Sequence, residues 1–135
     1  MTINDLSVGD IVNEPYEDEY RPIQITALRD DGWEKDYKNG ADDDWFDVED
    51  LKGIELTPEL LEKFGFTLGR DNNSATLPCK STDLILFRLD RDFRKFGWLW
   101  REVISISTVD QLQHALRMSG YKDFANSLDK HFDIR

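Results

Sequence analysis

The first 56 residues consist of short apolar runs separated by tight-turn signals, a pattern that predicts strands rather than helices. Ile23, Ile25 and Ala27 recur with the period of two that is typical of a half-buried strand. Asp31-Gly32 is a dipeptide that closes hairpins. We therefore expect a small curled antiparallel sheet over residues 1–56, of which an SH3-like sheet is one form.

A short helix is expected at residues 57–65. Thr57 can cap it, Pro58 suits its first position, and Glu59 complements the positive end of the helix dipole. Gly65 supplies a left-handed stop.

Residues 66–107 predict a second antiparallel sheet. The apolar run from Leu84 to Leu89 suits a central strand, and Trp98 to Ile106 is the longest strand candidate. The charged segment from Asp90 to Phe96 between them is expected to form a turn.

A helical segment is expected at residues 108–135. Thr108 and Gln111 have the spacing of a capping box, and Leu112 and Leu116 lie on one apolar face. With 135 residues, the chain predicts a single α+β domain with an N-terminal β-rich lobe, a linking helix, a second sheet and C-terminal helix.

The charge divides unevenly between the two halves. Residues 1–62 hold 19 acids and 5 bases, a balance of −14, whereas residues 63–135 hold 9 acids and 12 bases, a balance of +3. The net charge of −11 opposes binding to nucleic acid or to anionic membranes. The asymmetry indicates either an interaction surface or two halves that face each other within one fold.

Two clusters of carboxylates carry most of this negative charge. The first cluster consists of Glu14, Glu17, Asp18 and Glu19, and the second consists of Asp42, Asp43, Asp44 and Asp47. Such clusters form solvated loops, bind divalent cations, imitate nucleic-acid phosphates or dock onto a basic protein. The residue order of an EF-hand loop is missing, so we predict no metal site. Of the remaining alternatives, we predict that the clusters bind a basic protein partner.

A basic and aromatic segment in the second half permits other interpretations. Its bases are interleaved with Trp98 and Trp100, which lie on the same side of a strand if that strand is regular. Stacking aromatics among bases are typical of single-stranded nucleic-acid grooves, of a core, or of a contact between copies of the chain. The net charge makes the nucleic-acid interpretation the weaker one, and self-association through these tryptophans stays open.

Enzyme signatures are missing from the sequence. The phosphate-binding glycine loops, the nucleophile elbow and the H-E-x-x-H pattern do not occur. His114, His131 and Cys79 have no neighbouring group that would make them catalytic. We expect a non-enzymatic protein without a cofactor, and the alternative is an enzyme with an unrecognised carboxylate site.

The cellular setting follows from two further features. No apolar run approaches the roughly 20 residues of a membrane span. Cys79 is the only cysteine, so no disulfide framework is possible. These features predict a cytoplasmic protein that does not enter the membrane.

The segment "DWFDVEDLKGIELTPELLEKFGF" resembles one found in a family of small proteins from bacteria and their mobile elements. The residues that carry the resemblance are Trp45, Ile54, Leu56, Thr57, Glu59, Leu61, Lys63, Phe64, Gly65 and Phe66. The opening "LSVGDIV" and the later "VDQLQHAL" are also similar to this family. The family has no established activity, so the resemblance implies a fold and a bacterial or phage setting, in which an inhibitor of a host protein would fit.

Overall fold

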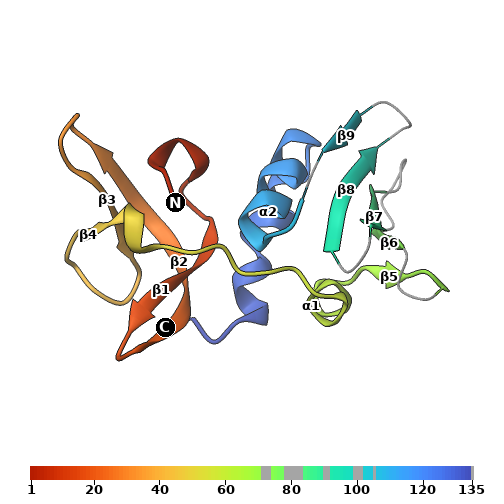
Figure 1. Cartoon of the computed structure of the whole chain (residues 1–135), viewed down its shortest axis with the longest axis horizontal. Coiled ribbons are helices and arrows are strands. Elements are labelled where there is room, and N and C mark those ends of the chain that lie inside the picture. The colour runs from red at the N-terminus through yellow and green to blue at the C-terminus, as the bar shows by residue number, and fades with distance from the viewer. Residues whose placement is uncertain (71–73, 78–83, 90–91, 99–101, 105, 135) are drawn as a thin grey trace.

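The computed structural model describes residues 1–70, 74–77, 84–89, 92–98, 102–104 and 106–134. For the strands between residues 84 and 104 it describes the backbone and not the side chains. Within these ranges the chain forms two antiparallel sheets with helices between them (Figure 1). This arrangement confirms the predicted α+β class.

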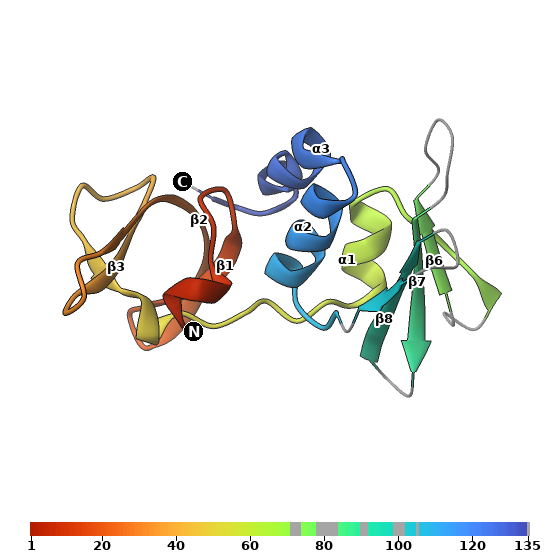
Figure 2. The ribbon, with the colours of Figure 1, turned by 90° about the horizontal axis from the view of Figure 1, so that it is seen from above.

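The first sheet contains four strands in sequence order within the described ranges. They are β1 (Ile11–Tyr16), β2 (Glu19–Asp30), β3 (Lys35–Asn39) and β4 (Phe46–Asp47). The 12-residue β2 pairs with β1 along its first half and with β3 along its second half. The pairing shifts between Ile25 and Ala27, and such an irregularity bends a strand. Figure 2 shows the resulting curl.

Two 3₁₀ turns flank this sheet, η1 (Ile3–Asp5) and η2 (Val48–Asp50). They help to enclose a core formed by Leu6, Val12, Ile23, Ile25, Tyr37, Val48 and Leu51. We call residues 1–51 the N-terminal lobe.

The linking helix α1 (Pro58–Lys63) begins and ends as predicted. The Thr57 hydroxyl accepts a hydrogen bond from the Leu60 backbone N–H at 3.1 Å. Gly65 has a φ of 99°, which glycine adopts without strain. The cap and the stop could be predicted because each depends on residues close in sequence.

The second sheet has, in the described ranges, five strands in sequence order. They are β5 (Thr67–Leu68), β6 (Ser74–Leu77), β7 (Leu84–Leu89), β8 (Asp92–Trp98) and β9 (Glu102–Ile104). The prediction that the run from Leu84 to Leu89 is central is confirmed.

Two expectations for this sheet are wrong. The segment Asp90 to Phe96 was expected to be a turn, yet strand β8 begins at Asp92. The expected long strand from Trp98 to Ile106 is divided, because β8 ends at Trp98 and β9 begins at Glu102. Pairing of β8 with both β7 and β9 outweighs the weak strand preference of its charged residues.

The C-terminal segment forms α2 (Val109–Met118), α3 (Lys122–Asn126) and the 3₁₀ turn η4 (Leu128–His131). The predicted apolar face of α2 is buried. The predicted capping box is not formed, because the Thr108 hydroxyl makes no cap bond and Gln111 Oε1 accepts from the Ser107 backbone N–H at 2.8 Å. Tertiary packing around Thr108 therefore overrides the local pattern.

A second core lies between the helices and the second sheet. It is formed by Ile11, Leu56, Leu61, Phe64, Phe66, Ala75, Leu77, Ile106, Val109, Leu112, Ala115, Leu116, Ala125 and Leu128. Ile11 belongs to this core, whereas its neighbour Val12 belongs to the core of the N-terminal lobe. Successive side chains of a strand point to opposite faces, so β1 contributes to both cores.

Candidate functional site

The first acid cluster lies at the tip of the β1–β2 hairpin. Tyr16 pairs with Glu19, which leaves Glu17 and Asp18 as a two-residue turn. Their φ angles are 47° and 67°, in the left-handed region that a turn of this length requires but that side chains disfavour. Glu17, Asp18 and Glu19 are all exposed. The hairpin thus presents three carboxylates to solvent.

Glu14 does not belong to this exposed group, contrary to expectation. Its side chain is buried, with 4% of the residue exposed. It accepts hydrogen bonds from Tyr37 Oη at 2.6 Å, Asn39 Nδ2 at 2.7 Å and Arg21 Nε at 2.8 Å. A buried carboxylate needs such partners because it has lost its water. Glu14 is therefore a structural residue of the N-terminal lobe.

The Glu14 network changes the proton affinities of its partners. Burial, followed by the hydrogen bond to Glu14, raises the pKa of the Tyr37 hydroxyl far above its ordinary value. The hydrogen bond to Glu14 also raises the pKa of Arg21, which therefore stays charged. The network keeps Tyr37 as a hydrogen-bond donor and Arg21 as a cation at any physiological pH.

The second acid cluster is held beside the first by Asn39. Its Oδ1 atom accepts hydrogen bonds from the backbone N–H groups of Ala41 at 3.0 Å and Asp42 at 2.8 Å, while its Nδ2 atom donates to Glu14. Arg21 lies within 3.5 Å of Asp42 as well as within 2.8 Å of Glu14. The loop that carries the second cluster is thus fixed to β1 and β2.

The carboxylates of the second cluster are exposed and only weakly paired. Asp42 contacts Arg21 at 3.5 Å, and Asp43 contacts Lys38 at 3.4 Å. Exposed pairs at such distances add little stability. Asp44 and Asp47 are exposed and form no ion pair within the described part of the chain.

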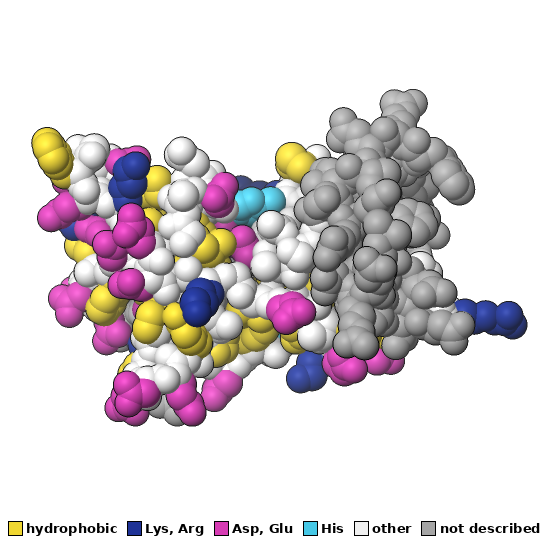
Figure 3. All heavy atoms as spheres, in the orientation of Figure 1, with side chains coloured by type: hydrophobic (Ala, Val, Ile, Leu, Met, Phe, Trp, Pro, Cys, Tyr) yellow, Lys and Arg dark blue, Asp and Glu magenta, His cyan; other side chains and the backbone are white. Residues whose placement is uncertain are grey.

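We call the exposed acids of the two clusters the acidic face. It consists of Glu17, Asp18, Glu19, Asp42, Asp43, Asp44 and Asp47. In Figure 3 the Asp and Glu side chains are spread over the N-terminal lobe at the left of the view. All seven residues are exposed.

A cavity of about 250 Å³ lies between the buried Glu14 and acids of the second cluster. It is lined by Glu14, Pro15, Tyr16, Arg21, Tyr37, Asp42, Phe46, Asp47 and Asp50. The rings of Tyr37 and Phe46 are 5.8 Å apart, and the Arg21 guanidinium lies 4.0 Å from the centre of the Tyr16 ring. The cavity therefore combines aromatic walls with carboxylates, a combination suited to cationic side chains.

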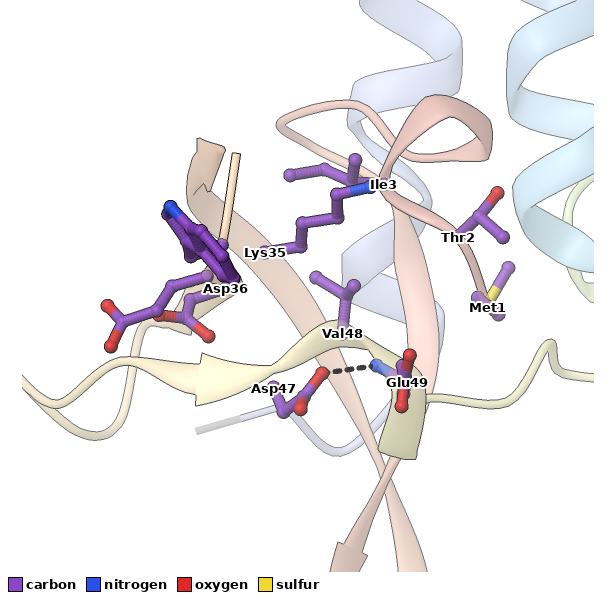
Figure 4. Close-up of a pocket in the computed structure, with 10 residues that line it drawn as sticks. Met1, Thr2, Ile3, Lys35, Asp36, Asp47, Val48 and Glu49 are labelled. Carbon is purple, nitrogen blue, oxygen red and sulfur yellow. Dashed lines mark hydrogen bonds between the residues drawn. The ribbon is translucent and has the colours of Figure 1, made fainter. Parts of the chain in front are cut away.

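A larger cavity of about 380 Å³ lies on the other side of Asp47. It is lined by Met1, Thr2, Ile3, Trp33, Glu34, Lys35, Asp36, Asp47, Val48 and Glu49. In Figure 4 the Lys35 side chain extends toward Ile3, and the dashed line marks the hydrogen bond that Asp47 accepts from the Glu49 backbone N–H. Four of the lining side chains are carboxylates, so this cavity is also acidic.

Of the two tryptophans of the second half, the structure describes only the backbone of Trp98. Trp98 ends β8, where its backbone pairs with Leu84 and Glu102, and Figure 1 places β8 beyond helix α2 from the N-terminal lobe. Trp100 lies outside the described residues, as does Cys79. The predicted role of these two tryptophans in partner binding therefore stays a prediction.

Sequence reasoning missed a cluster of polar residues between the N-terminal lobe and helix α2. Asp10 is fully buried. Its Oδ2 atom lies 2.7 Å from His114 Nε2, and its Oδ1 atom accepts a hydrogen bond from Arg117 Nη1 at 2.5 Å. The Ser7 backbone N–H also donates to Asp10, at 2.8 Å. Asp10 therefore connects the two parts of the molecule.

Gln113 completes this connection. Its Oε1 atom accepts a hydrogen bond from the Ile11 backbone N–H at 2.8 Å, and its Nε2 atom donates to the carbonyls of Gly9 and Ala125, both at 3.0 Å. A side chain at Gly9 would approach Arg117 Nη2 to 3.1 Å. We call Gly9, Asp10, Gln113, His114 and Arg117 the junction. The partners of Asp10 on helix α2 lie more than a hundred positions later in the chain, so no local pattern indicates them.

The junction also sets the charge state of His114. The hydrogen bond to Asp10 raises the pKa of His114, and burial partly opposes this effect. An aspartate that orients a histidine also occurs in general-base catalysis. His114, however, lines neither of the two cavities described above. The geometry favours a structural role in joining the lobes.

Other features of the described residues bear on the remaining predictions. No group of three or more His, Cys, Asp or Glu side chains in the described ranges has an arrangement that could hold a metal ion. No helix within those ranges is long and apolar enough to cross a membrane.

No family model, no curated protein and no solved structure matches this chain. The resemblance to the bacterial family therefore stays a prediction, and the function has to be argued from the geometry.

Proposed function

We propose that this chain is a non-enzymatic interaction protein whose acidic face binds a basic surface of another protein. The observation that supports this function most directly is a cavity with aromatic walls that is lined by Asp42 and Asp47 of the second cluster together with the buried Glu14 of the first. Glu14, Asn39 and Arg21 hold the clusters together from beneath, so the exposed acids are presented by a fixed scaffold.

The acidic face has the electrostatics of a docking surface. Carboxylates of one sign repel each other, and this repulsion reduces the stability of the compact fold. The same field attracts a basic partner and accelerates its association. Most acids of the face are free of strong ion pairs within the described residues, so binding does not first have to break internal contacts.

The resemblance described above supports a bacterial or phage setting for this activity. In that setting we propose a cytoplasmic inhibitor that covers a basic groove of a host protein. Because grooves of this kind bind nucleic-acid phosphates, a rigid array of carboxylates can compete for them.

The proposal is tested by a pull-down from bacterial lysate with matched variants. The test variant combines Glu17→Gln, Asp18→Asn and Glu19→Gln, which removes three charges from the acidic face. The control variant combines Glu55→Gln, Glu59→Gln and Glu62→Gln, which removes the same charge from exposed positions outside the face.

We expect the wild type and the control to retain the same basic protein at low salt, and the test variant to lose at least roughly tenfold in affinity. Binding should also weaken steeply as salt is added, because exposed charges are screened. Retention that is insensitive to salt, or equal loss in both variants, would contradict the proposal.

A further inference from the structure

Trp33 is the most exposed large apolar side chain among the described residues. It lies in the turn between β2 and β3, and 96% of its surface is accessible. The turn is well formed, because Asp31 Oδ1 accepts hydrogen bonds from the backbone N–H groups of Trp33 at 3.0 Å and Glu34 at 2.6 Å. The indole is thus held outward by a defined turn, although its contact with water is unfavourable.

Three other aromatic rings of this lobe, those of Tyr16, Tyr20 and Trp45, each have a cationic side chain of the same protein over them. The contacts, measured from the cationic centre to the ring centre, are Arg21 on Tyr16 at 4.0 Å, Lys52 on Tyr20 at 4.6 Å, and Arg29 and Lys38 on Trp45 at 4.5 and 5.0 Å. Among the described residues, Trp33 has no cation over its ring. Of the two tryptophans in this lobe, Trp33 is thus the one without a cation over its ring in the described residues, and the exposed ring of Phe46 also has none there.

The surroundings of Trp33 are acidic on balance, because four carboxylates line the adjoining cavity together with one lysine, Lys35, and the N-terminal residue Met1. Trp33 lines the cavity of about 380 Å³ together with the carboxylates of Glu34, Asp36, Asp47 and Glu49. Arg29 contacts Glu34 at 3.0 Å and Asp36, which neutralises part of this charge. Asp47 and Glu49 have no ion pair within the described ranges, and Asp47 also belongs to the acidic face.

These surroundings determine whether an apolar or a cationic group of a partner can bind favourably to the indole. An apolar partner would have to take unpaired carboxylates out of water, which is costly. A cation is attracted both by the face of the aromatic ring and by the carboxylates. Of the two common cations, arginine is planar and weakly hydrated, so it stacks on an indole better than lysine does.

We propose that Trp33 is the contact point for an arginine side chain of the basic partner, with the guanidinium stacked on the indole and paired with carboxylates of the adjoining cavity. This inference rests on the proposed function and adds a preference for arginine to it. The contact extends the acidic face along the edge of the N-terminal lobe toward the β2–β3 turn.

Peptide titration of the full chain at low salt tests this preference. The probes are nona-arginine and nona-lysine, which carry equal charge. The variants are Trp33→Ala and, as a matched control, Tyr20→Ala, which removes a half-exposed ring that Lys52 already covers. We expect the wild type and Tyr20→Ala to bind nona-arginine roughly threefold more tightly than nona-lysine. Trp33→Ala should bind both peptides equally.

A second measurement follows the indole directly. The side-chain N–H resonance of Trp33, assigned by its loss in Trp33→Phe, should shift more with nona-arginine than with nona-lysine.

The outcomes separate the two proposals. If nona-lysine binds the wild type but Trp33→Ala keeps the preference for arginine, the Trp33 contact is overturned and the proposed function stands. If neither peptide binds the wild type, the proposed function itself is overturned. If Trp33→Ala instead lowers the mass of the unliganded chain in light scattering, the indole contacts a second copy, which also overturns the arginine contact.

Discussion

Carboxylates at the junction are buried and fully partnered, whereas those of the acidic face are exposed and almost unpaired. Asp10 is fully buried and has partners on helix α2, while Asp18 stands in the hairpin turn with no ion pair among the described residues. Both are ordinary aspartates of the acidic first half of the chain. The difference shows that one residue type serves two purposes, stability where water is excluded and recognition where water is present.

The largest expected effect concerns the buried member of this comparison. Asp10→Ala leaves the charge of Arg117 without its partner and removes the hydrogen bond to His114. We expect the free energy of unfolding to fall by about 3 kcal/mol, because breaking a buried ion pair strands the remaining charge. Urea unfolding followed by far-ultraviolet circular dichroism measures this change.

The control for this prediction is Asp18→Asn, which keeps the side-chain shape and tolerates the left-handed φ. It should change the free energy of unfolding by less than about 0.5 kcal/mol. If both substitutions changed the free energy of unfolding equally, the assignment of a structural role to the junction and not to the acidic face would be wrong.

A smaller effect of opposite sign is expected on the acidic face. Glu17 has a φ of 47°, which costs a residue with a side chain roughly 1 kcal/mol more than it costs glycine. Glu17→Gly should therefore raise the free energy of unfolding by about 1 kcal/mol while removing one charge from the face.

Glu19→Gly provides the contrast, because Glu19 begins strand β2 and glycine weakens strands. This substitution should lower the stability in the same urea experiment. A loss of stability from Glu17→Gly would show that the turn is not strained and that the face is not maintained at the expense of stability.

The smallest expected effect is the pH dependence of the junction. Because Asp10 raises the pKa of His114, the folded chain keeps the His114 proton to a higher pH than the unfolded chain does. The stabilisation is therefore complete below the ordinary histidine pKa of 6.5 and is lost as the pH rises through the folded pKa. His114→Gln should remove this dependence.

Other groups titrate as well, so the measurement is the difference in melting temperature between wild type and His114→Gln from pH 5.5 to 8.5. Burial lowers the pKa of His131, and this effect cancels because His131 is present in each protein. Burial raises the pKa of Asp110 and the charge of His114 opposes that rise, so Asp110 contributes to the measured difference. A difference that grows with rising pH would contradict the assigned role of Asp10.

Several parts of the fold were predictable because their causes are local. The Thr57 cap, the Gly65 stop and the turn at Asp31-Gly32 depend on residues within a few positions of each other. Glu17, Asp18, Glu19 and the second cluster are exposed, as is usual for carboxylates in turn-rich segments, whereas Glu14 of the first cluster is buried. Strand β8 was missed because its pairing with β7 and β9 outweighs the preferences of its own residues.

The sequence by itself determined the α+β class, the cap and the stop of helix α1, and the sign of the charge on the N-terminal lobe. Only the tertiary structure decided which acids are structural, because Glu14 and Asp10 find their partners on other strands or on a helix far along the chain. Likewise, an exposed Trp33 could not be distinguished from a core tryptophan until the fold placed it. Burial and partners are properties of the folded surface, and a local pattern of residues does not contain them.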